Sequence, residues 1–181
     1  GGLSTELAQL QADLKGDGWV VIRHDVDPTA TVPSIKSIVV SDYNADPAVV
    51  KAVYIVGHVP VPYSGALNPD GHAEHLGAWP CDGYYGDVNG TWTDVSATAT
   101  GGNDPRDHNV PGDGKFDQSD FPSAVELHVG RVDFNAMSAF SQGALELTRA
   151  YLNKAHAYKT NQLVPLRRGI VFDNFQYMSS P

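Results

Sequence analysis

Apolar residues recur at helical spacing in three segments of the chain. In the first, leucines separated by four, three and four residues share one face of a helix that Gly16 and Gly18 end; they are Leu3, Leu7, Leu10 and Leu14. A second helix is predicted from Pro33, a favourable first-turn residue, to the break at Asp46-Pro47. A third, longer helix is predicted over about residues 141–160, with Leu145, Leu152 and Ala155 on one face.

Strands are predicted where apolar residues run together or alternate. Short continuous runs at residues 19–22, 52–56 and 169–172 are typical of strands buried on both faces. Residues 125–132 alternate between apolar and polar, as in a strand with one exposed face. Helices and strands that follow one another through short links indicate an α/β fold with a mostly parallel sheet flanked by helices in three layers. We expect residues 1–181 to form a single α/β domain.

The middle of the chain, residues 60–122, shows almost no periodicity. It is rich in Gly, Asp, Asn, Thr and Pro, which predicts a long loop and hairpin insertion. A loop of this length is uncommon in a compact domain unless something holds it. We expect its aromatic residues, bound ions, or both to do so.

Polar residues directly follow three of the predicted strands, at positions 24–27, at His58, and at Asp173 and Asn174. Ligands of open parallel sheets bind beyond the carboxyl ends of the strands. These positions therefore predict one substrate cleft, for which His58, Asp173 and Asn174 are the candidate residues. The alternative is that strand ends are polar because they lead into loops.

Two Asp/Asn-rich segments offer the oxygen ligands that calcium prefers. The stronger candidate contributes Asn109, Asp113, Asp117 and Asp120, with glycine at the sixth position of the loop. Pro111 fills the third ligand position and the flanks are not helical, so an EF-hand is not expected and a looser calcium site is. The second candidate contributes Asp87 and Asn89. Both segments can also be turns whose backbone is satisfied without a metal.

Charge and cysteine content exclude several classes of function. The formal net charge is −9 and the pI is about 5.0, so the chain would repel a phosphate backbone and nucleic acid is not an expected partner. No apolar run is long enough to predict a membrane span. Cys81, the single cysteine, excludes an internal disulfide. A catalytic pair of Cys81 and His58 is a weaker possibility, because the neighbouring Asp82 disfavours a thiolate.

Taken in order, four segments resemble the N-terminal half of the gingipain-type cysteine peptidase domain, which has a caspase-like fold. They are a strand that ends at a proline-containing corner (54–62), an Asp-x-Tyr-Tyr-like segment (81–90), a Val-Gly-Arg strand (125–132), and a long helix followed by a strand that ends in Asp173-Asn174. The resemblance covers roughly residues 19–175.

The resemblance implies a secreted or cell-surface bacterial protein, calcium-supported loops, and cysteine endopeptidase activity on protein or peptide substrates. In that family the catalytic histidine and cysteine follow the strand that corresponds to residues 169–172. No residue here matches that dyad, so this chain alone is expected to be inactive. It begins with Gly1-Gly2 directly before a helix and stops soon after a predicted strand. We therefore expect it to be a portion of a larger protein and to pair with the remainder of the same polypeptide. The alternative is a catalytically inactive extracellular structural or binding module of the same fold.

Overall fold

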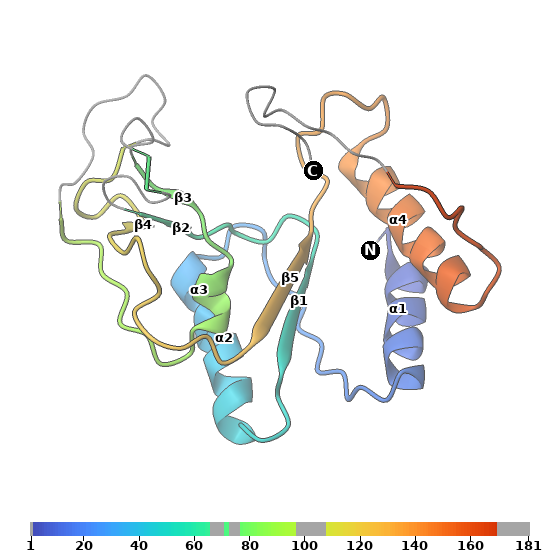
Figure 1. Ribbon diagram of the computed structural model, residues 1–181, viewed down its shortest axis with the longest axis horizontal. Helices are drawn as coiled ribbons and strands as arrows, with labels where there is room; N and C mark the ends of the chain where they lie inside the picture. Colours follow the sequence, from blue (N-terminus) through green and yellow to red (C-terminus); the bar gives the residue numbers. More distant parts are fainter. Residues whose placement is uncertain (1, 66–70, 73–76, 97–107, 170–181) are drawn as a thin grey trace. The chain divides into compact units, whose positions relative to one another are not determined.

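The computed structural model describes residues 2–65, 71–72, 77–96 and 108–169. The chain divides into two compact units. One comprises residues 1–22 and 145–181, and the other comprises residues 23–144. Figure 1 shows the elements of both units along the chain. The expectation of a single domain is not tested by this division and stays a prediction.

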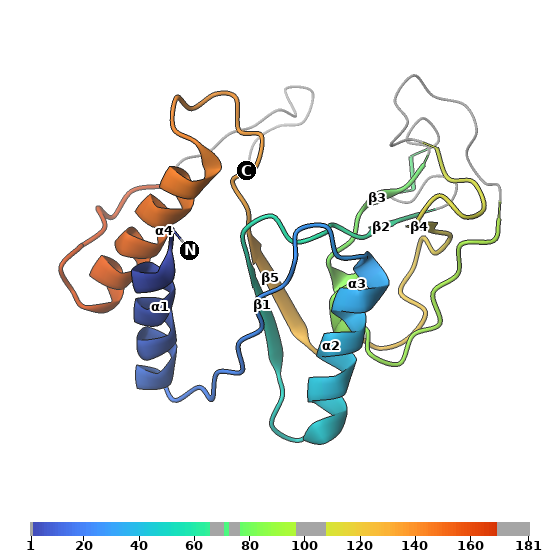
Figure 2. The same ribbon diagram turned by 180° about the vertical axis from the view of Figure 1, so that it is seen from behind.

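A parallel pair of strands forms the centre of the unit at residues 23–144. Strand β1 (Ala52–Val56) pairs with β5 (His128–Val132), and the register places Ala52 opposite His128 and Val56 opposite Val132. The sheet is visible from both sides in Figures 1 and 2. The fold is therefore α/β with a small parallel sheet and helices, as the apolar runs predicted.

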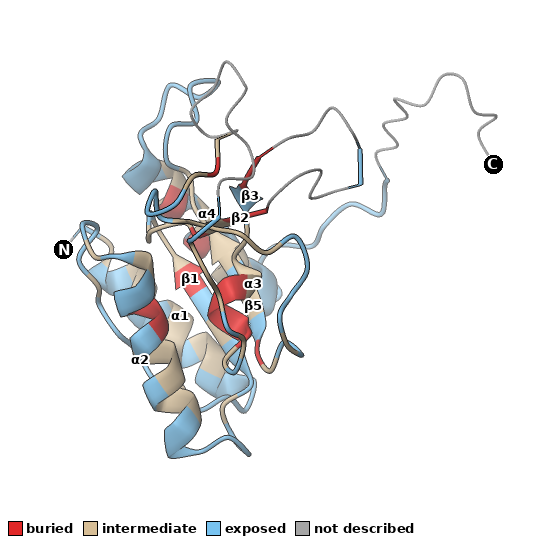
Figure 3. Ribbon diagram, turned by 90° about the vertical axis from the view of Figure 1, so that its left-hand side faces the viewer, coloured by how far each residue is buried: buried red, intermediate tan, exposed pale blue. Residues whose placement is uncertain are grey.

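Two helices accompany this sheet. Helix α2 (Val32–Ala45) begins at Thr31, whose hydroxyl accepts a hydrogen bond from the backbone N–H of Ser34, and Pro33 lies in its first turn. Helix α3 (Gly83–Gly86) is a single turn that contacts α2, β1 and β5. Figure 3 shows that burial is concentrated on α3. The core cluster of buried residues consists of Ile35, Ile55, Tyr84 and Tyr85.

Aromatic rings hold together the region that was predicted to be a long loop. The ring of Tyr84 stacks on Phe116 with centroids 4.5 Å apart, and Trp92 meets both rings edge-on. Three two-residue strands lie nearby: β2 (Tyr63–Ser64) pairs antiparallel with β3 (Trp79–Pro80) and parallel with β4 (Lys115–Phe116). The expectation that aromatic residues organise this insertion is confirmed for its described part.

The other unit contains two helices, α1 (Ser4–Gly16) and α4 (Ala144–Lys159), close to the ranges that the apolar spacing predicted. Acidic side chains of the first segment meet basic side chains of α4: Glu6 with Arg149, Asp13 with His156, and Asp17 with Lys159. Residues later in the first segment pair with residues later in α4, so the two helices run in the same direction. No helix in the described part of the chain has the length and apolar character needed to cross a membrane.

The predicted strand at residues 19–22 is wrong. This segment has no strand conformation, and Trp19, Val20 and Ile22 are exposed. An apolar run favours a buried strand only if a neighbouring strand pairs with it, and no strand does so among the described residues. The predicted strand at 169–172 falls almost entirely outside the described residues.

Candidate functional site

The clearest arrangement of reactive side chains lies where β1 and β5 end. His58 follows β1 and Asp133 follows β5, and the parallel register brings their side chains together. The Nδ1 atom of His58 lies 2.8 Å from the Oδ2 atom of Asp133. The imidazole is 55% exposed and the carboxylate 15%. The pair is thus an accessible imidazole oriented by a more enclosed carboxylate.

The turn after β5 fixes Asp133. Its Oδ1 atom accepts a hydrogen bond from the backbone N–H of Asn135 at 2.8 Å. Burial raises the pKa of Asp133, but the hydrogen bonds from His58 and Asn135 outweigh it, so the net pKa lies below its usual value. The carboxylate is therefore ionised at neutral pH and favours a proton on Nδ1 of His58. This leaves Nε2 as the accessible atom, 3.5 Å from the Asn135 amide nitrogen.

Backbone strain adjoins this pair. Ala136 has a φ of 55°, in the left-handed region that a residue with a Cβ rarely adopts. Such a conformation costs on the order of 1 kcal/mol and persists only where surrounding structure enforces it. In this turn the amide nitrogen of Asn135 lies 3.5 Å from Nε2 of His58.

An arginine on β5 stabilises the segment that follows β1. The guanidinium of Arg131, on β5, forms a two-pronged ion pair with Asp82 at 2.7 and 2.8 Å. It also donates hydrogen bonds to the backbone carbonyls of Val59 and Pro60. The phenol of Tyr85 donates to the Pro60 carbonyl as well, at 2.7 Å. The segment that leaves β1 through His58 is therefore tied to α3 and β5.

A buried carboxylate lies at the end of α3. Asp87 is fully buried, and its two oxygens accept hydrogen bonds from the backbone N–H of Gly90, the indole N–H of Trp92 and the hydroxyl of Ser123. A Cβ on Gly90 would lie 2.2 Å from this carboxylate, so only glycine allows the close approach. With its oxygens satisfied by three donors, Asp87 organises the loop.

A buried lysine lies over the same turn. The ammonium of Lys36 donates to the carbonyls of Tyr84 and Asp87 and lies 4.7 Å from the centroid of the Tyr84 ring. Burial lowers the pKa of Lys36 to about 8, against the opposing effect of Asp87 and Glu126. Because its ammonium donates hydrogen bonds to carbonyls in the last turn of α3, Lys36 caps the C-terminus of this short helix.

Most of the predicted calcium ligands already take part in hydrogen bonds. Asp113 accepts from the backbone of Val110 and from Lys115, while Asp117 accepts from Thr93 and from two backbone N–H groups. Asn89 donates to Glu126, and Asp120 is exposed. Within the described ranges, no group of three or more His, Cys, Asp or Glu side chains is placed to hold a metal ion.

Asn109 differs from the other candidates in having a buried oxygen that no hydrogen bond uses among the described residues. Its side chain is fully buried, and its amide nitrogen donates to the carbonyls of Gly65 and Phe116. These two acceptors fix the amide orientation and leave the Oδ1 atom buried without a partner among the residues that the structure describes. A calcium ion would have to replace the N–H donors on the carboxylates, so calcium binding stays a prediction.

Cys81 has the properties of a structural thiol. It lies before α3, and burial raises its pKa, an effect that the backbone N–H of Tyr84 only partly offsets and the charge of Asp82 reinforces. The thiol is therefore protonated at neutral pH. The ring of His58 makes its hydrogen bonds with Asp133 and Asn135, not with Cys81. These contacts do not favour a Cys81–His58 nucleophile.

The sequence predicted part of this site. His58 lies at a strand end, as expected, whereas Asp173 and Asn174 lie outside the described residues. The predicted contribution from residues 24–27 is not supported, because the strand expected before them does not form. Asp133 was missed, although it directly follows β5, a strand that was predicted over residues 125–132 and forms at His128–Val132. Lys36, Asp82 and Arg131 were also missed, since their partners are 48 to 72 residues away in sequence.

Comparison of the chain with protein-family models, with curated proteins and with solved structures found no match.

Proposed function

We propose that this chain is the non-catalytic N-terminal portion of a secreted, caspase-like bacterial cysteine endopeptidase. In this proposal the three-layer fold is completed by the remainder of the polypeptide, which supplies the catalytic histidine and cysteine. The thiolate would attack the peptide carbonyl to form an acyl-enzyme, with histidine as the acid and base. The present residues would provide part of the sheet and one border of the substrate cleft.

The observation that carries the proposal is the pairing of His58 with Asp133 at the carboxyl end of β1 and β5. In open parallel sheets this edge is where ligands bind. The ordered resemblance to the gingipain-type domain supports the same assignment. The protonated state of Cys81 supports placing the nucleophile elsewhere. His58 is assigned to substrate contact, because its exposed Nε2 faces away from Asp133.

The experiment uses the complete polypeptide that contains this chain. It is treated with a peptidyl acyloxymethyl ketone, which alkylates the nucleophile of a cysteine peptidase, and the labelled peptide is located by mass spectrometry. We expect label on a cysteine outside residues 1–181 and the same labelling in the Cys81→Ser variant. Label on Cys81 would overturn the proposal. Absence of both labelling and peptide hydrolysis would instead favour the inactive structural or binding module.

Calcium support belongs to the same proposal. Within the described ranges of the chain, the Oδ1 atom of Asn109 is a buried acceptor without a partner, which is the kind of atom that a cation or a bound water satisfies. Unfolding midpoints with excess calcium and with a chelator test this. An ion bound only to the folded chain must raise the midpoint by mass action. We expect a higher midpoint with calcium, and an unchanged midpoint would remove calcium from the proposal.

A further inference from the structure

A small cavity with an unusual lining lies apart from the β1–β5 edge. Its volume is about 180 Å³, and it opens between β3 and the segment that follows β4. Three aromatic side chains border it: Trp79, Trp92 and Phe121. Among the remaining lining residues that the structure describes, Asp120 is the one acidic side chain.

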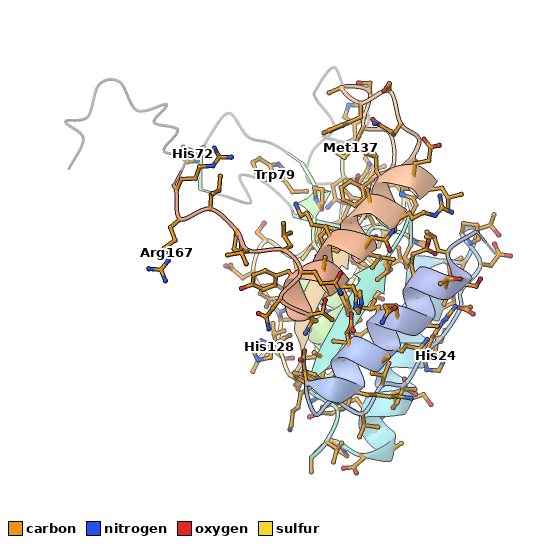
Figure 4. All side chains as sticks on the ribbon, turned by 90° about the vertical axis from the view of Figure 1, so that its right-hand side faces the viewer. His24, His72, Trp79, His128, Met137 and Arg167 are labelled. Atoms are coloured by element: carbon orange, nitrogen blue, oxygen red, sulfur yellow. The ribbon has the colours of Figure 1, made fainter. Side chains whose placement is uncertain are left out.

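Two of the aromatic side chains remain partly exposed. Trp79 is 43% exposed and Phe121 is 49% exposed. Figure 4 labels Trp79, whose indole projects from the ribbon. Trp92 is fixed by its hydrogen bond to Asp87 and meets the ring of Phe121 edge-on, with centroids 6.0 Å apart. The cavity therefore has one fixed and two accessible aromatic walls.

Phe121 is held at this place by close packing. A Cβ on Gly83 would lie 2.4 Å from the tip of the Phe121 ring, so the ring occupies the space that a side chain at position 83 would fill. The glycine at the start of α3 thus permits Phe121 to reach the cavity.

The polar groups of the cavity restrict the ligand. The amide of Gln118 is engaged with Thr93 through both its oxygen and its nitrogen, and Ser64 donates to the carbonyl of Gln118. Asp120 makes no hydrogen bond or ion pair within the part of the chain that the structure describes. One carboxylate beside several aromatic rings offers charge but few hydrogen bonds, which suits a cation that needs none.

The chain already uses aromatic attraction for a cation elsewhere, because the Lys36 ammonium lies over the Tyr84 ring in the core. The net charge of −9 adds long-range attraction for a positively charged ligand. From these features we propose that the cavity bordered by Trp79, Trp92, Phe121 and Asp120 binds a quaternary ammonium group. This site is independent of the proposed peptidase function.

The test compares choline with 3,3-dimethyl-1-butanol, its neutral carbon isostere. Binding to the full chain is followed by tryptophan fluorescence and by chemical shifts of the indole N–H groups, at constant ionic strength. We expect choline to shift the Trp79 signal and the isostere to bind at least fivefold more weakly, because only choline carries the charge. Equal binding of the two compounds would overturn the proposal.

Variants locate the site. We expect Trp79→Leu and Asp120→Asn each to weaken choline binding about three- to tenfold, since each removes one attraction to the cation. The matched control is Trp19→Leu, because Trp19 is exposed to a similar extent, 50%, and does not line the cavity. Unfolding midpoints show whether each variant is folded. Unchanged choline affinity in folded Trp79→Leu and Asp120→Asn would contradict the assignment.

Discussion

Two aspartates of this chain show how the same side chain can serve the fold or a site. Asp87 is fully buried at the end of α3 and accepts hydrogen bonds from three donors, so no part of it is available to a ligand. Asp133 lies at the carboxyl end of β5, where it uses its oxygens to orient an exposed imidazole and the turn beside it. Carboxylate chemistry alone does not separate these roles. The two roles differ in whether the side chain that the carboxylate contacts is accessible to a ligand.

The largest effect on stability is expected from substitution of Asp87. Asp87→Ala leaves the N–H of Gly90, the indole N–H of Trp92 and the Ser123 hydroxyl, all partly buried, without their acceptor. We predict a loss of about 3 kcal/mol or more in the free energy of unfolding. Urea denaturation measures it. A loss below about 1 kcal/mol would mean that water reaches these donors and that Asp87 does not organise the loop.

Arg131 links the segment that follows β1 to Asp82 at the start of α3. We expect its substitution to have the next largest effect on stability. Arg131→Lys keeps the charge but cannot form the two-pronged ion pair with Asp82 and also reach the carbonyls of Val59 and Pro60. We predict a destabilisation of about 2 kcal/mol. The matched control is Arg23→Lys, because Arg23 pairs with Asp25 on the surface and contributes little. Equal effects of the two variants would contradict the role given to Arg131.

The contribution of Lys36 to stability is expected to depend on pH. Its pKa is about 8 in the folded chain and near 10.5 when unfolded, so the unfolded chain binds the proton more tightly. Stability should therefore rise as pH increases through this interval, because the cost of burying the ammonium disappears when it loses its proton. Lys36→Met lacks this group. We predict that the stability of the wild type relative to Lys36→Met rises by about 1 to 2 kcal/mol between pH 8 and pH 10.

Urea denaturation of both proteins across this range measures the difference. Burial raises the pKa of Tyr85 to about 12, so its ionisation lowers stability as pH rises beyond about 10, but both proteins contain Tyr85 and this effect cancels in their difference. A difference that stays constant from pH 8 to pH 10 would show that the ammonium is better solvated than its burial indicates.

The smallest effect on stability is expected at the strand edge. His58→Gln removes an exposed imidazole and its contact with Asp133, for which we predict a loss of no more than about 1 kcal/mol. In the wild type, the nitrogen chemical shifts of His58 should report the proton on Nδ1 in the neutral form of the ring, because Nδ1 faces the Asp133 carboxylate. A proton on Nε2 would contradict the orientation that Asp133 imposes.

Local pattern predicted the elements of this fold better than their partners. The leucine spacing before Gly16 and the first-turn proline at Pro33 are encoded within a few residues, and the helices there formed as predicted. The run at residues 19–22 carried the same apolar signal as β1 but not the information about what pairs with it. The contacts of Lys36 and Arg131 depend on residues far along the chain, which no local pattern shows.

The candidate site was predictable where it depends on the end of a strand. His58 followed from the rule for parallel sheets, and the same rule applied to the strand at residues 125–132 would have found Asp133. The burial of Asp87 was not predictable, because its Asp-Val-Asn-Gly sequence is equally suited to a turn or a metal ligand. Only the three donors around it settle its role in the fold.

The central claim is that the reactive side chains described here form a border for a substrate and not a nucleophilic centre. The rate of Cys81 alkylation by iodoacetamide across pH 5 to 10 tests it most directly, with Cys81→Ser as the blank. We predict a rate that is low at neutral pH and rises only above the usual thiol pKa, unchanged in His58→Gln, because burial keeps the thiol protonated. A rapid reaction at neutral pH that is lost in His58→Gln would contradict the account.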